Sequence, residues 1–112
     1  MIELTIYNFL KEKTNIPVYM EIPNLQKIDK FYTIEKTGSS KTNHIQESTF
    51  ALQSWGNSMI DVIRLNEEIK ALIESAIILN EIVSVRINSD YNYTETSLKK
   101  YRYQAVVDIV HY

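Results

Sequence analysis

The sequence contains no cysteine, so disulfide bridges, thiolate metal sites and cysteine-based catalysis are excluded, and a reducing compartment is compatible with the composition. Glycine and proline number only two each among the 112 residues, and we therefore expect no long disordered or low-complexity linker. A chain of this length suffices for one core and is too short for two. We expect residues 1–112 to fold as a single ordered domain.

Neither sign of charge dominates, because 12 basic and 14 acidic residues give a formal net charge of −2. Such a chain has no global positive field that would attract nucleic acid or anionic lipid. The longest apolar run, residues 75–85, is interrupted by Asn80 and Glu81 and is too short to span a bilayer. We expect no membrane partner, no specific nucleic-acid binding and, since no basic segment precedes an apolar one at the N-terminus, no signal peptide.

Apolar periodicity divides the chain into helices and strands. Residues 2–13 carry apolar side chains at helical spacing, which predicts a short amphipathic helix. Ser58 and Asp61 resemble a capping box at the start of a long second helix. The buried stripe expected for that helix comprises Met59, Val62, Ile63, Ile69, Leu72, Ile73 and Ala76. Strands are predicted at residues 17–23, 31–36, 49–55, 82–87 and 99–112, the last with one buried and one polar face.

The predicted order is α-β-β-β-α-β-β, which indicates an α+β fold. Its natural form has two layers, a mainly antiparallel or mixed sheet packed by two helices, because each element must bury its apolar side against another layer. The connection between the second and third strands is long for a hairpin, roughly ten residues. The sheet face without helices, rich in tyrosine and threonine, would remain available for a partner.

No stretch satisfies the requirements of a familiar chemical site. The segment Gly38-Ser39-Ser40-Lys41-Thr42 has a glycine and a Lys-Thr pair, but it lacks the second glycine of a phosphate loop and leads into a strand instead of a helix. His44 and His111 are far apart, and neither has a further ligand at metal-binding spacing. We expect no cofactor, no metal and no catalytic residue.

Two aromatic features admit more than one interpretation. Tyrosines and basic residues alternate near the C-terminus, which could stack single-stranded nucleic acid, although a half-buried strand explains the pattern better. The residues concerned are Tyr91, Tyr93, Lys99, Lys100, Tyr101, Arg102 and Tyr103. Trp55, the only tryptophan, is either a core anchor or an interface residue, and the turn that follows at Gly56-Asn57 favours the core.

The succession of pieces resembles the tail terminator, or tail-to-head joining, proteins of long-tailed bacteriophages and prophages. The matching stretches are Ile34-Glu35-Lys36-Thr37-Gly38-Ser39 at a strand end and Leu52-Gln53-Ser54-Trp55-Gly56 before the long helix. The resemblance covers nearly the whole chain. Residues 88–98 depart from it, because relatives often have a proline before an Arg-Tyr pair there.

The resemblance implies a structural protein of the virion and no enzyme. Its members form a ring, commonly a hexamer, on the last ring of tail-tube protein, where they stop tube growth and join the head through its connector or stopper protein. It implies assembly in the host cytoplasm and is compatible with a monomer in free solution. The residues expected at the interface, in an initially mobile loop, are Gly38, Ser39, Ser40, Lys41, Thr42, Asn43, His44, Ile45, Gln46 and Glu47. The alternative is a small nucleic-acid-binding or regulatory module that uses the Tyr/Lys/Arg-rich C-terminal strand.

Overall fold

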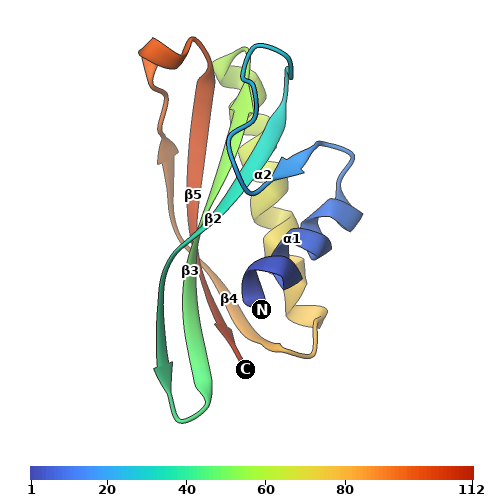
Figure 1. Cartoon of the computed structure of the whole chain (residues 1–112), viewed down its shortest axis with the longest axis vertical. Helices are drawn as coiled ribbons and strands as arrows, with labels where there is room; N and C mark the ends of the chain where they lie inside the picture. Colours follow the sequence, from blue (N-terminus) through green and yellow to red (C-terminus); the bar gives the residue numbers. More distant parts are fainter.

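The computed structural model describes all 112 residues and confirms an α+β fold with a five-stranded mixed sheet and two helices (Figure 1). The molecule is elongated, with principal extents of 44 × 24 × 21 Å. Two short 3-10 turns, η1 (Ser75–Ile78) and η2 (Thr96–Leu98), precede the last two strands. The helices and strands are α1 (Ile2–Lys13), β1 (Val18–Tyr19), β2 (Phe31–Thr42), β3 (Ile45–Gly56), α2 (Met59–Glu74), β4 (Ile82–Asn92) and β5 (Tyr101–His111).

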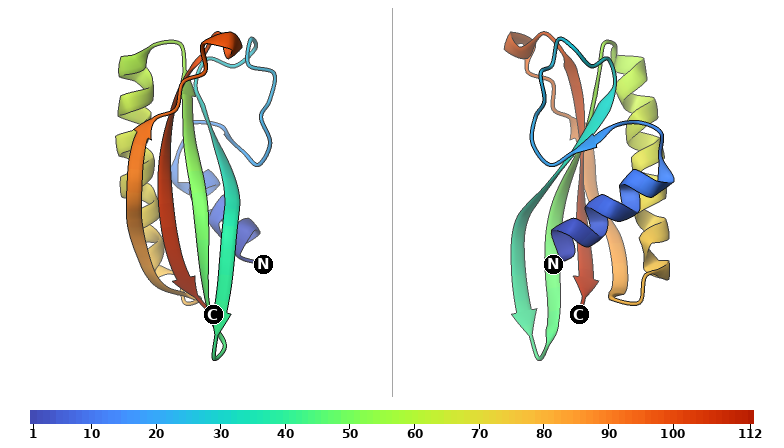
Figure 2. Two further views of the ribbon diagram at one scale, coloured as in Figure 1. Left: turned by 90° about the vertical axis from the view of Figure 1, so that its left-hand side faces the viewer. Right: turned by 45° about the vertical axis from the view of Figure 1, so that its right-hand side comes forward.

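The strands lie in the order β1-β2-β3-β5-β4, so β3 and β5 are central and β4 forms one edge. β1 is parallel to β2, and all other neighbours are antiparallel. Both helices cover the same face of the sheet, which leaves the other face without a helix (Figure 2). One apolar core of 17 buried residues joins α1 and α2 to that covered face.

The long helix α2 follows the predicted pattern in most positions. The Ser58 hydroxyl accepts a hydrogen bond from the Asp61 N–H at 3.2 Å, which satisfies one of the orphan donors at the helix start. Ile63 of the predicted buried stripe is 38% exposed, Met59 and Leu72 are half-buried, and the buried Ala76 lies in η1. Leu65 and Asn66, which were not predicted, are buried on α2. Neither α1 nor α2 combines the length and apolar character needed to cross a bilayer.

The predicted long loop between the second and third strands is wrong. β2 runs to Thr42, β3 begins at Ile45, and only Asn43 and His44 lie between them. Both turn residues have positive φ, 50° and 70°, the conformation of a tight hairpin turn whose twist matches that of the strands. Asparagine tolerates this region, so the turn forms without the glycine that usually marks it. Residues 38–47 are therefore an ordered hairpin end, which we call the arm.

Two other predictions about strands are wrong. The strand expected at residues 17–23 is only β1. Residues 20–30 instead form an irregular segment, which lies beside the first residues of β2. The final strand was expected to have a solvent-exposed polar face. Gln104 and Asp108, on that face, are buried, because β5 is flanked on both sides by other strands and neighbouring side chains close over it.

Candidate interaction surfaces

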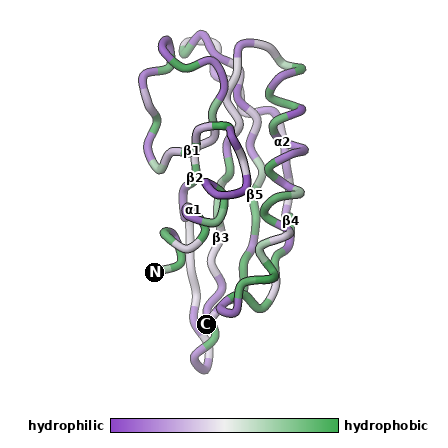
Figure 3. Tube along the Cα trace, turned by 90° about the vertical axis from the view of Figure 1, so that its right-hand side faces the viewer, coloured by the Kyte–Doolittle hydropathy of each residue, from purple (hydrophilic) through white to green (hydrophobic).

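The arm brings all ten predicted interface residues together at one end of the molecule. Five of them, Gly38 to Thr42, leave the body on β2, and Ile45 to Glu47 return on β3. Pairing with β5 stops at Gln46, so the turn and the residues next to it stand free of the rest of the sheet. Figure 1 shows this end extending beyond both helices and both termini. Figure 3 colours most of the arm pale to purple, so the arm is held by strand pairing and not by a core.

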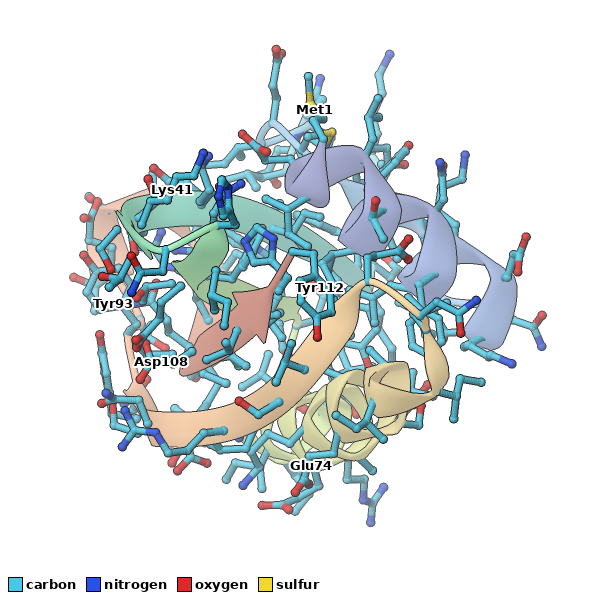
Figure 4. All side chains as sticks on the ribbon, turned by 90° about the horizontal axis from the view of Figure 1, so that it is seen from below. Met1, Lys41, Glu74, Tyr93, Asp108 and Tyr112 are labelled. Carbon is cyan, nitrogen blue, oxygen red and sulfur yellow. The ribbon has the colours of Figure 1, made fainter.

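The outer part of the arm carries little charge and one exposed apolar side chain. Ile45 is 42% exposed beside the turn. Lys41 is the only formally charged residue between positions 38 and 46. Its side chain lies at the end of the molecule, as Figure 4 shows in the view along the arm. The outer part of the arm thus presents one apolar residue and one positive charge, and Glu47, exposed at the inner end, adds a negative charge.

On the helix-free face, a chain of hydrogen bonds crosses four neighbouring strands. Trp55 Nε1 donates to Thr33 Oγ1 at 3.0 Å, and Thr33 Oγ1 donates to Gln53 Oε1 at 2.9 Å. Gln53 Nε2 donates to Gln104 Oε1 at 2.6 Å, and Gln104 Nε2 donates to the Tyr91 hydroxyl at 2.6 Å. We call these five residues the polar ladder. Each member uses the partner beside it, so buried polar groups on this face are satisfied within the fold.

Trp55 is fully buried, which confirms its prediction as a core residue, and its ring is packed from two sides. Phe31 stacks on it with ring centroids 5.5 Å apart. The Arg102 guanidinium lies 4.6 Å from the Trp55 ring centroid and 4.4 Å from that of Tyr93. Stacking between two aromatic rings stabilises the cation and holds the end of the sheet together.

Two of the three basic residues of the C-terminal aromatic cluster, Lys100 and Arg102, are occupied inside the fold, and the third, Lys99, is exposed. Arg102 donates from Nε to the Tyr93 carbonyl at 3.0 Å and is only 7% exposed. Lys100 Nζ donates to the carbonyl of Ile28 at 2.7 Å and to Asn57 Oδ1 at 3.0 Å. Lys100 thereby ties residues 20–30 to the start of β5. Neither cation is positioned to contact a phosphate backbone.

Above the polar ladder lies a hollow of about 420 Å³. Thr33 and Gln53 of the ladder are among its lining residues, together with Arg102 and Tyr93. Residues 20–22 border it, and there Met20 and Ile22 are 43% and 54% exposed. Glu21 and Glu35, both exposed, add negative charge to its border. We call this site the acidic hollow.

Asp108 anchors a second polar cluster on the helix-free face. Its Oδ1 accepts from the Thr49 hydroxyl at 2.8 Å, and its Oδ2 accepts from Arg86 at 2.7 Å and Asn88 at 3.0 Å. These hydrogen bonds, that from Asn88 foremost, hold the pKa of Asp108 below its ordinary value of 3.8. Figure 4 shows Asp108 and Tyr93 on the side of the sheet away from α2 and its Glu74.

A third candidate lies near the N-terminus, where a cavity of about 350 Å³ is lined by residues that include His111, Glu3 and Lys36. The Ser48 hydroxyl and His111 Nε2 are 2.8 Å apart, the separation of a nucleophile and its base. Ser48 is fully buried in the sheet, however, so its oxygen is not presented to a substrate. Lys36 and Glu3 form an ion pair at 3.2 Å across the cavity edge. These contacts indicate a structural role for the region.

Sequence reasoning singled out residues 38–47, but as a loop and not as a hairpin, and it missed the acidic hollow. Met20 and Ile22 lie in the stretch predicted as a strand over residues 17–23, and the strand patterns around Thr33 and Gln53 predict no hollow. The available signal was Gln53 within the apolar run that leads to Trp55, where a long polar side chain needs partners. No group of three or more histidine, cysteine, aspartate or glutamate side chains is arranged to hold a metal ion.

A scan against protein-family models and a search of curated proteins both find no match to this chain.

Proposed function

We propose that this chain is a tail terminator, or tail-completion protein, of a long-tailed bacteriophage or prophage. In this proposal several copies, six in the form that the resemblance suggests, close a ring on the last ring of tail-tube protein. The ring stops tube growth and offers its other surface to the head connector or stopper protein. The chain acts as a structural protein of the virion at the head-proximal end of the tail, without a cofactor or catalytic step.

The projecting arm is the observation that carries this proposal. A stiff hairpin that extends beyond the core of a small domain buries little within its own molecule, so its residues are available for a neighbour. A contact between an arm and a different surface on the next copy is heterologous, and heterologous contacts generate rings when the rotation closes.

The two stretches that carry the family resemblance support the proposal from a second direction. Residues 34–39 and 52–56 are separated in sequence but lie on paired strands, where Ile34 is opposite Leu52. The first stretch leads out to the arm, and the second contains Trp55 and the entry into α2. The resemblance therefore falls on the hairpin that supports the arm and not on scattered surface positions.

Electron microscopy of tail tubes tests the proposal. Purified protein is added to tubes assembled from the tail-tube protein of the phage or prophage that encodes this chain, and we expect ring-shaped density at one end of each tube and no further growth there. Protein that leaves tube ends bare and growing would contradict the proposed function.

An arm-shortened variant tests whether the arm makes the contact. Deleting Lys41, Thr42, Ile45 and Gln46 removes two complete cross-strand pairs and keeps both the turn and the strand register. The fold should survive, because the deleted residues lie outside the core, but capping should be lost. Ile77→Ser, an exposed position near the end of α2, is the matched control and should cap tubes normally.

A further inference from the structure

We infer that the arm of one copy docks in the acidic hollow of a second copy of this chain. The inference rests on the proposed function in treating the arm as an assembly element, and it names the surface that receives it. The occupant is a second copy, and the chemistry of the two surfaces, together with their positions on the molecule, supports this assignment.

The charges of the two surfaces are complementary. Lys41 is the only formal charge on residues 38–46, and the one other charge of the arm, Glu47, lies further from the turn, opposite Ser40. The exposed charged residues at the hollow, Glu21 and Glu35, are both negative. Arg102 also lines the hollow, but it is buried between two rings and has Glu95 at 3.8 Å. The hollow therefore presents net negative charge to an approaching arm, which favours Lys41 and steers association.

The apolar parts of the two surfaces also match. Ile45 is exposed on the arm, and Met20 and Ile22 are exposed at the border of the hollow. Burying these side chains against one another removes apolar surface from water that the isolated chain leaves exposed. Tyr93, 46% exposed at the same hollow, supplies an aromatic wall.

The arm cannot reach the hollow of its own molecule. Thr33 lines the hollow and Thr42 precedes the turn, and both lie on the same strand, β2. Nine residues of extended strand separate them by about 30 Å. Arm and hollow therefore lie toward opposite ends of one rigid element, and a contact between them has to join two molecules head to tail.

Cysteine cross-linking in the full-length chain tests the inference, and the absence of native cysteines makes the result unambiguous. The test variant carries Ile45→Cys and Ile22→Cys. A disulfide requires Cα atoms within about 7 Å, so this pair cannot close within one molecule. Oxidation at a protein concentration of about 1 mM, which captures contacts of millimolar affinity, should give a ladder of dimers, trimers and larger species on a non-reducing gel.

The control variant keeps Ile22→Cys and replaces the arm cysteine by Ile78→Cys, a 69% exposed position in η1, outside the arm. It should give only the small amount of dimer that random collision produces. Circular dichroism confirms that both variants are folded. A yield from the test pair no greater than that of the control would overturn the inference.

A charge reversal tests the electrostatic part. Adding Lys41→Glu to the test pair places a negative charge against Glu21 and Glu35, and we expect the yield of cross-linked oligomers to fall severalfold at low salt. An unchanged yield of cross-linked oligomers would overturn the assignment of the acidic hollow as the docking site.

The tube-capping experiment separates this inference from the proposed function. Capped tubes without a specific Ile45–Ile22 cross-link would overturn the inference and leave the function intact, with the arm then contacting the tail-tube protein. If the test pair gives cross-linked oligomers but tail tubes stay uncapped, the contact between copies is established and the proposed function is contradicted.

Discussion

Replacing Thr33 by valine tests the energetic importance of the polar ladder. Valine has nearly the same shape, so the substitution removes the hydroxyl and little else. That hydroxyl accepts from Trp55 Nε1 and donates to Gln53 Oε1, and both partner side chains are buried. Thr33→Val therefore leaves one buried donor and one buried acceptor unsatisfied.

Each unsatisfied buried group costs about 1–3 kcal/mol, and we expect Thr33→Val to lower the free energy of unfolding by about 2–4 kcal/mol. For a domain of this size the melting temperature falls by roughly 4 °C per kcal/mol, which gives a decrease of about 8–16 °C. This loss is a large fraction of the stability of an ordinary domain.

Urea unfolding followed by tryptophan fluorescence measures the change, because Trp55 is the only tryptophan and is itself a member of the ladder. Thr42→Val is the matched control. It makes the same chemical change at an exposed position on the same strand and should shift stability by less than about 0.5 kcal/mol. Equal effects of the two substitutions would refute the reasoning that the ladder stabilises this face.

Three further predictions concern single side chains. His44 has a φ of 70°, so His44→Gly should relieve left-handed strain and raise stability by about 0.5–1 kcal/mol in thermal unfolding. The buried Ser54 hydroxyl has no hydrogen-bond partner, so Ser54→Ala should leave stability unchanged or raise it by about 1 kcal/mol in urea unfolding. The pKa of Asp108 is lowered below 3.8 in the folded state. The ionised carboxylate therefore stabilises the fold fully above the pKa of the unfolded state, and this stabilisation is lost as the pH falls through the lower pKa of the folded state. The difference in unfolding free energy between wild type and Asp108→Asn should therefore be constant near neutral pH and shrink in the acid range below about pH 4.

Local patterns were sufficient to predict the helices and the apolar halves of the strands. The stripe along α2 and its Ser58 cap depend on neighbours a few residues apart, and Trp55 was correctly placed in the core. The arm was mistaken for a loop because the Asn43-His44 turn has no glycine. Its outgoing strand, residues 38–42, consists of glycine, serine, lysine and threonine, which resemble a connection until cross-strand pairing is known.

The helix-free face was harder to predict, because its burial depends on contacts distant in sequence. Gln104 and Asp108 alternate with apolar residues as solvent-facing side chains do. They are buried because β3 and β4 flank β5 and supply partners such as Gln53 and Asn88. Similarly, Lys100 resembles a free cation until its bond to the carbonyl of Ile28, 72 positions away, is seen. The ladder and the hollow therefore emerge only from the tertiary structure.

The position of the hollow and the arm on one strand limits how assembly can be cooperative. Thr33 is held by hydrogen bonds to Gln53 and Trp55 of β3, and β2 is paired with β3 from Phe31 to Thr42 with one register shift between Lys36 and Gly38. A switch transmitted along the strand would need two alternative arrangements of these bonds. The cooperativity expected in this assembly instead comes from geometry. In the proposed ring, each copy adds one weak heterologous contact, a tube end holds several copies close together, and closure of the ring leaves no arm or hollow unfilled.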